Sequence, residues 1–207
     1  MKSLHRPDLF AWTVFNPERN LDFHGYLWTR GGTGNVAFDP LPLTEHDAAH
    51  IEREGGIAWI YLTNADHVRA TAAVAARFGA RIVAPVGERH LPELRDLPVA
   101  RWLEPDEEDP VTGLLCLAMN GSKSPGELAF VLPGRDTAIC GDLVRGPRGG
   151  SLDLLPAGKL SDRAAAITSV RRLLAVPGLD AVLPGDGHPV FRDAQVVLAE
   201  LLAVLTR

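Results

Sequence analysis

In the first half of this chain, a short continuous run of apolar residues is followed by apolar residues at helical spacing. Residues 57–62 form a short apolar run rich in β-forming side chains. Residues 70–78 then combine strong helix formers with apolar side chains at helical spacing. This pattern predicts a buried strand that leads through a turn into a helix. Asp66 and His67 lie in the connection between the two.

The segment before this strand has the pattern of a β-rich unit followed by one helix. Glycines at 31, 32 and 34 supply a turn between apolar runs. Thr44, with Asp47 three residues later, has the sequence of a helix N-cap, and the helix is expected to end at Gly55-Gly56. The predicted strands are residues 9–15, 21–29 and 35–38.

The rest of the chain contains more predicted strands than helices. Three apolar runs with tight connections predict an antiparallel meander. Ser161 is expected to cap the helix that follows it. The predicted strands are residues 81–84, 99–103, 114–119, 128–132, 137–140 and 181–183, and the predicted helices are residues 162–175 and 189–205.

The order of these elements decides between two kinds of α/β architecture. Strands come first, a run of strand–helix units follows, and then more strands, a helix, a strand and a helix. A single doubly wound sheet does not need two separate clusters of antiparallel strands. We therefore expect an α+β fold in which two sheets pack together with helices outside, built as one domain over residues 1–207.

Charge and composition narrow the classes of partner. The formal net charge of −5 argues against a nucleic-acid-binding surface. No apolar run is long enough to span a membrane, and the first residues do not resemble a signal peptide. Cys116 and Cys140 lie in apolar, strand-like runs, which favours buried free thiols in a reducing cytoplasm. A small-molecule substrate is the expected partner, and the oligomeric state, a homodimer included, stays open.

Acid and imidazole side chains recur at the ends of predicted strands. Asp66 and His67 follow one strand, Asp142 follows a second, and His188 follows the last. In α/β sheets the carboxyl ends of strands are where ligands bind. Taken singly, Asp66 is a helix cap, His67 a structural residue and Asp142 a turn former. Together they favour a metal site assembled from several strands.

The motifs and their order resemble the metallo-β-lactamase fold superfamily over most of the chain. In that family one strand ends in Thr-His-x-His-x-Asp-His, a later turn carries Gly-His-Thr-Pro-Gly, and two further strands end in Gly-Asp and Gly-His. The matching segments here are Asp66-His67, Ser124-Pro125-Gly126, Gly141-Asp142 and residues 183–188. The resemblance implies an αββα sandwich of two mixed β-sheets packed face to face.

The departures from the family pattern affect the ligands of one of the family's two metal ions. The opening histidines are missing, with Asn64 in place of one of them, and Lys123 stands where the second motif has its histidine. All three ligands of the first ion are therefore absent. The resemblance implies that a single divalent ion remains, with zinc favoured over iron or manganese, and with the ligands Asp66, His67, Asp142 and His188.

Several polar residues near these motifs are candidates for supporting roles. We hypothesise that the Lys123 ammonium replaces the charge of the first ion and pairs with Asp142, because two neighbouring carboxylates would otherwise repel each other. Arg69 and Arg145 are candidates for binding a substrate carboxylate or phosphate, with solvated charges as an equally weighted alternative. His24 is a candidate group beneath the site, although a partly buried sheet histidine is the simpler interpretation.

Two functions follow from the resemblance. The first is a metal-dependent hydrolase in which one ion activates water against an ester, thioester, amide or phosphoester bond, with Asp66 or Asp142 as the catalytic carboxylate that orients the water or takes its proton. The second is a degenerate, non-catalytic member of the family, without a metal, that binds a small ligand or a protein partner. Loss of half the ligands favours the second, and retention of one complete half-site favours the first.

Overall fold

The computed structural model describes residues 1–134 and 136–206, and its strands form two main sheets. The first sheet has the order β1 to β7, and the second has the order β13-β10-β9-β8. A small third sheet pairs β11 (Val144–Arg145) with β12 (Asp153–Leu154). The strands of the two main sheets are β1 (Lys2–Ser3), β2 (Leu9–Asn16), β3 (Leu21–Trp28), β4 (Val36–Phe38), β5 (Trp59–Tyr61), β6 (Arg81–Pro85), β7 (Val99–Leu103), β8 (Leu115–Ala118), β9 (Leu128–Val131), β10 (Thr137–Cys140) and β13 (Ala181–Pro184).

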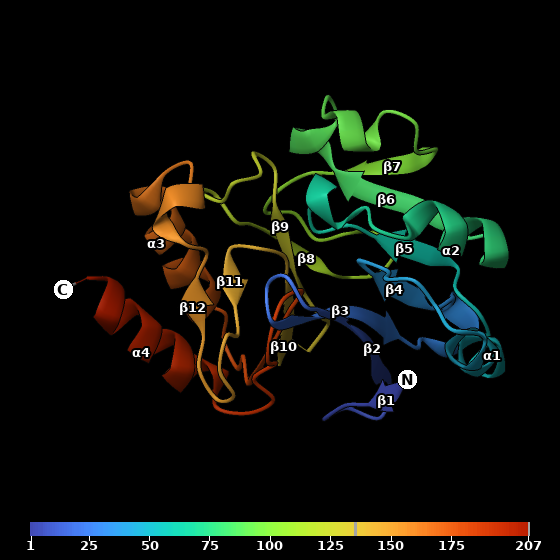
Figure 1. Ribbon diagram of the computed structural model, residues 1–207, viewed down its shortest axis with the longest axis horizontal. Helices are drawn as coiled ribbons and strands as arrows, with labels where there is room; N and C mark the ends of the chain where they lie inside the picture. The colour runs from blue at the N-terminus through green and yellow to red at the C-terminus, as the bar shows by residue number, and fades with distance from the viewer. Residues whose placement is uncertain (135, 207) are drawn as a thin grey trace.

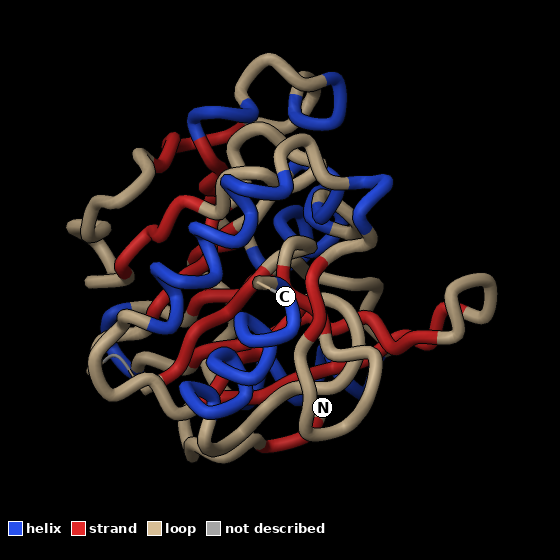
Figure 2. The backbone as a smooth tube through the Cα atoms, turned by 90° about the vertical axis from the view of Figure 1, so that its left-hand side faces the viewer, coloured by secondary structure: helices blue, strands red, loops and turns tan. Residues whose placement is uncertain are grey.

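Helices cover the outer faces of this pair of sheets, as the expected α+β sandwich requires (Figure 1). The α-helices are α1 (Glu45–Arg53), α2 (Thr71–Phe78), α3 (Arg163–Leu174) and α4 (Ala194–Leu205). In Figure 2 helices lie in front of the strands when the molecule is viewed from the side of α3 and α4. None of the helices within the described residues has the length and apolar character needed to cross a membrane.

Three apolar clusters hold the layers together. The central cluster joins the facing sides of the two sheets, and the rings of Phe38, Tyr61 and Phe130 pack there with centroids 5.6 to 6.1 Å apart. A second cluster lies between the first sheet and α1 and α2, and a third lies between the second sheet and α3 and α4. Every residue of β9 and β10 is buried, because both faces of these strands are covered.

The element boundaries differ from the sequence-based predictions mainly at helix starts. Thr44 caps α1 as predicted, accepting a hydrogen bond from Asp47 N at 3.1 Å. The cap of α3 is Asp162 and not Ser161, because the Asp162 carboxylate accepts from the backbone N–H groups of residues 164 and 165. The helix α4 begins only at Ala194, after Asp193 adopts a positive φ of 57°.

The topology brings several strand ends to one edge of the molecule. β10 and β13 are parallel neighbours, and Cys140 pairs with Pro184 in their register. The residues two positions beyond that pair, Asp142 and Asp186, therefore leave adjacent strands at the same level. β4 and β5 are also parallel neighbours, which places Asp39 beside the segment that follows β5. The candidate site is built where these four ends meet.

Candidate metal centre

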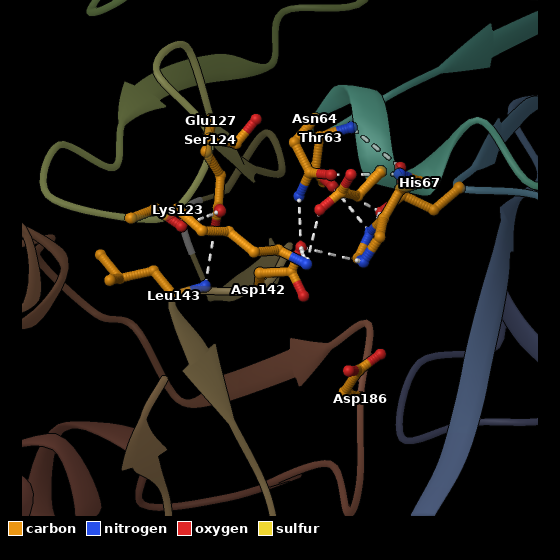
Figure 3. Close-up of polar contacts among 12 residues, drawn as sticks. Thr63, Asn64, His67, Lys123, Ser124, Glu127, Asp142, Leu143 and Asp186 are labelled. Carbon is orange, nitrogen blue, oxygen red and sulfur yellow. Dashed lines mark hydrogen bonds and ion pairs between the residues drawn. The ribbon is translucent and has the colours of Figure 1, made fainter. Parts of the chain in front are cut away.

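Three buried side chains at this edge could hold one metal ion. His67, Asp142 and Asp186 each offer a ligand atom, and these atoms all lie within 4.8 Å of one another. His67 comes from the 3-10 helix η2 (Ala65–His67), and the two carboxylates follow β10 and β13. Figure 3 shows Asp142 between His67 and Lys123, with the Asp186 carboxylate turned toward the same space. We call these three residues the ligand group.

The imidazole of His67 is oriented by hydrogen bonds on its far side. Asn64 caps η2 by accepting from His67 N at 3.1 Å. The ring atom Nδ1 lies 2.8 Å from Asp39 Oδ2 and 3.1 Å from the Thr63 hydroxyl. Asp39 Oδ2 has no proton to donate, so Nδ1 carries the hydrogen of this pair. Nε2 is left facing Asp142 Oδ2 at 3.6 Å, which is the orientation that metal ligation needs.

The charge of His67 depends on what occupies the site. Burial and the neighbouring Arg69 act to lower the pKa of His67, but Asp39 and Asp142 outweigh them and raise it to about 9. Without a metal, the imidazole is therefore protonated at neutral pH. Because a metal ligand must be the neutral imidazole, ion binding at this residue has to release a proton.

Asp142 lies at the centre of the charged cluster. Its Oδ2 accepts from Asn64 Nδ2 at 3.2 Å and lies 3.1 Å from Lys123 Nζ. Burial would raise the pKa of Asp142, but His67 and Lys123 hold it well below the usual range for a carboxyl group. The side chain is therefore an anion, as a ligand or a catalytic carboxylate must be. Gly141 permits this packing, since a Cβ there would lie 2.7 Å from Asn64 Nδ2.

Asp186 is the member of the ligand group that the sequence did not predict. Its side chain is 4% exposed, and it accepts a hydrogen bond from Arg69 Nη2 at 3.2 Å. The preceding Gly185 lies against the imidazole of His67, because a Cβ there would be 2.6 Å from the ring atom Cε1. The sequence does carry a signal for it: Gly185-Asp186 occupies the strand end where the resembling family has its final Gly-His pair.

Two of the predicted ligands lie outside the ligand group. His188 is exposed, because Gly187 with φ of 84° turns the chain away from the site and His188 N donates to Gly146 O. Asp66 is half-exposed and forms an ion pair with Lys123, at 2.6 Å between Oδ2 and Nζ. The two remaining predicted ligands, His67 and Asp142, lie together.

The other candidate residues divide into those that touch the ligand group and those that do not. Asn64, Lys123 and Arg69 all contact at least one of its members. His24 supports it from beneath: its backbone N donates to Gly185 O at 2.9 Å, and its Nε2 lies 2.7 Å from Gly187 O. Arg145 lies on β11, and among the described residues it is not one of those that line the cleft above the group.

A buried glutamate ties two segments of the site together. The carboxylate of Glu88 accepts hydrogen bonds from Ala65 N, from the Ser124 hydroxyl and from Gly126 N. Ala65 begins the 3-10 helix that carries His67, and Ser124 follows Lys123 directly. Glu88 thus fixes the two sides of the charged cluster relative to each other. Sequence periodicity gave no sign of this role, because Glu88 reads as one more charged residue in a loop.

An open cleft of ≈ 520 Å³ lies above the ligand group. Its floor contains His67, Asp142 and Asp186, with Asp66, Arg69 and Lys123 beside them. Its walls include the apolar side chains of Val14, Phe23, Leu41 and Pro42. The buried charged floor is therefore accessible to a small molecule.

The donor set fits a single divalent ion. One imidazole and two carboxylates are ligands that zinc, iron and manganese accept in proteins. The three donors are buried and lie within 4.8 Å of one another, with His67 on η2 and the two carboxylates just beyond β10 and β13. Four carboxylates (Asp39, Asp66, Asp142 and Asp186) gather around His67, so the surroundings favour a cation. Lys123 and Arg69 supply part of that positive charge in the protein alone.

Comparisons with known proteins agree on one family. The profile described as "Metallo-beta-lactamase superfamily" matches residues 1–205. No curated protein sequence matches the chain. Among solved structures, a metallo-beta-lactamase from Pontibacter korlensis superimposes with a TM-score of 0.76 at 17% identity, covering 98% of this chain and 96% of that one. A metallo-beta-lactamase family protein from Thermus thermophilus gives a TM-score of 0.70 at 18% identity, covering 97% and 80%. At such identities these two structures show the fold alone.

Proposed function

The chain belongs to the metallo-beta-lactamase superfamily, and from this premise we propose that it is a hydrolase that uses one divalent metal ion. The observation that supports the proposal is the ligand group itself, in which His67, Asp142 and Asp186 converge beneath an open cleft. When bound, such an ion supplies Lewis acidity that polarises a carbonyl or phosphoryl group and acidifies water. Zinc is the preferred ion, with iron and manganese as alternatives.

The residues around the ligand group have separate tasks in this proposal. Asp66 accepts a proton from the attacking water, because its carboxylate lines the cleft and does not belong to the ligand group. Lys123 binds negative charge that develops on the substrate. Burial alone would lower the pKa of Lys123, but Asp142 and Asp66 raise it, so the ammonium stays charged at neutral pH. The bond attacked is an ester, thioester, amide or phosphoester of a small molecule.

One observation favours the second candidate, a non-catalytic protein that binds a small ligand. Lys123 lies 3.1 Å from Asp142, and Arg69 lies 3.2 Å from Asp186, so each carboxylate of the ligand group already has a cationic partner. Such a cluster is stable without an ion. The two candidates differ in whether the purified protein retains a metal.

Elemental analysis of protein purified without chelators tests the proposed function. We expect about one ion per chain in the natural sequence, and loss of that ion in His67→Ala and Asp186→Asn, because each removes one of the three proposed ligands. His188→Ala is the matched control and should retain the ion, since His188 lies outside the ligand group. Absence of metal from the natural protein, also after incubation with zinc, would leave the ligand-binding candidate.

Hydrolytic activity is the second test of the proposed function. A panel of ester, thioester and phosphoester substrates should reveal turnover that a chelator abolishes and zinc restores. Asp66→Asn should lower kcat by about 10²-fold or more, the usual range for loss of a general base, without loss of the ion.

We also propose that the protein lies in the cytoplasm, since both cysteines are buried free thiols in the structure.

A further inference from the structure

Arg69 makes direct contact with two members of the ligand group. Its Nη2 lies 3.0 Å from His67 Nε2 and 3.2 Å from Asp186 Oδ1. Its Nη1 donates to the His24 carbonyl oxygen at 3.0 Å, and the side chain is only 11% exposed. The guanidinium therefore occupies the face of the group on which an ion would be bound.

The position of Arg69 is held from both sides. Its backbone has φ of 41°, in the left-handed region that costs a non-glycine residue about 1 kcal/mol or more. The Phe23 ring lies beneath the guanidinium, with 5.2 Å between the Arg69 Cζ atom and the ring centroid. A strained backbone and a cation–π contact at one residue indicate that the surrounding fold determines where this side chain lies.

Arg69 and a metal ion need the same atoms. The Arg69 Nη2 atom already lies 3.0 Å from His67 Nε2 and 3.2 Å from Asp186 Oδ1, so an ion ligated by these two atoms would lie against the positively charged guanidinium. An ion bound by the ligand group must therefore displace the guanidinium from His67 and Asp186. The displaced group keeps its bond to the His24 carbonyl but has lost its carboxylate partner, which is costly for a charge that is nearly buried.

We propose that Arg69 is a resident cation that fills the ligand group in the absence of a metal ion, and that ion binding frees its guanidinium to bind the anionic group of the substrate. This inference rests on the proposed function and adds the substrate class. The guanidinium binds carboxylate and phosphate groups with two parallel hydrogen bonds. The apolar walls of the cleft, formed by Val14, Phe23 and Leu41, suit an apolar body attached to that anionic group.

The first test measures zinc affinity by competition with a chromophoric chelator at fixed pH. Arg69→Met removes the competing cation, and the dissociation constant for zinc should fall at least tenfold. Arg19→Met is the matched control: Arg19 lines the same cleft and stacks on Phe23, but its nearest approach to the group is 3.8 Å, to Asp186. In Arg19→Met the dissociation constant for zinc should change less than threefold.

A second variant at the same position separates the effect of removing the charge from an effect of misfolding. Arg69→Gln keeps an N–H donor for the His24 carbonyl while removing the charge, and it should also bind zinc more tightly. Equal zinc affinity in the natural protein and in both folded Arg69 variants would overturn the inference while leaving the proposed function intact. Failure of the natural protein and all variants to bind zinc would overturn both.

The second test measures the coupling between ion and anion. Benzoate or phenylphosphonate should strengthen zinc binding by the natural protein at least fivefold, and neutral benzamide should not. Because coupling is reciprocal, zinc should strengthen binding of the same anions by the same factor. In Arg69→Met the coupling should fall below twofold. Equal coupling in the two proteins would mean that the anion binds the ion alone, which would overturn the role given to Arg69.

Discussion

Glu127 is a buried carboxyl group next to the ligand group, and its pKa is raised mainly by burial. Its side chain is 2% exposed, it accepts from Leu143 N at 2.8 Å, and it pairs with the Ser122 hydroxyl at 2.5 Å. Burial and the nearby Asp142 carboxylate raise the pKa of Glu127 from 4.5 to about 8. Folding therefore favours the neutral carboxyl group at this position.

This pKa gives a pH dependence of stability with a definite sign. Between pH 4.5 and 8 the folded protein holds a proton on Glu127 that the unfolded chain has released. The stabilising contribution is complete below pH 4.5 and is lost as the pH rises through 8, at up to about 1.4 kcal/mol per pH unit. Glu127→Gln is neutral throughout, so the natural protein should lose stability relative to it over this window. Denaturant unfolding of both proteins at several pH values measures the difference in their free energies of unfolding. A difference that stays constant across this pH range would contradict the prediction.

Single residues also show how far the site could be predicted from sequence. His67 and Asp142 were identifiable because each lies in the connection after a strand, within a motif of the family. Asp186 was not, because His188 two residues later fits the same motif by residue type. The bend at Gly187, with φ of 84°, turns His188 away from the ligand group that contains Asp186, and a backbone angle of this kind is not visible in the sequence.

At the scale of elements, the site depends on how closely β13 approaches η2. A Cβ on Gly185 would lie 2.6 Å from Cε1 of His67, closer than side chains pack. Gly185→Ala should therefore push the imidazole from its position and weaken zinc binding at least tenfold. Gly149→Ala is the control, since nothing lies within 4 Å of a Cβ there and its φ is not positive. Unchanged zinc affinity in a folded Gly185→Ala protein would contradict the geometry described for the ligand group.

Periodicity predicted the central strands and the first two α-helices to within one or two residues. It was less reliable where polar capping chemistry decides the boundary, as at Asp162, which takes the role predicted for Ser161. The final helix was predicted five residues too long, since Pro189 to Asp193 have no helical structure although their composition allows it. The two-residue strands β1, β11 and β12 are too short to produce any alternation.

At the scale of the whole molecule, the two sheets are joined by a shared aromatic core. Phe130 is fully buried in it, with ring centroids 5.6 Å from Phe38 and 5.7 Å from Tyr61. Phe130→Ala should lower the free energy of unfolding by about 3–5 kcal/mol. Phe15→Ala is the control, because Phe15 is 55% exposed, and it should change stability by less than about 0.5 kcal/mol. Denaturant titration measures both, and a small effect at Phe130 would contradict a core shared by the sheets.

The order of the elements predicted two packed sheets, as did the resemblance, but neither predicted which strands pair with each other. An apolar run shows that a strand is buried but not which neighbour it pairs with, because pairing depends on contacts between distant segments. The sequence also predicts one domain over residues 1–207. If that prediction holds, Phe130→Ala should shift a single unfolding transition rather than split it into two.

The central claim is that one ion is held by His67, Asp142 and Asp186. Anomalous diffraction at the zinc edge, from crystals grown with zinc, tests it most directly. We expect one strong peak per chain, ~2.0–2.2 Å from His67 Nε2 and from an oxygen of each carboxylate, with the Arg69 guanidinium no longer bonded to His67. A peak at His188, or a zinc-soaked crystal with no peak among these three side chains, would contradict the account.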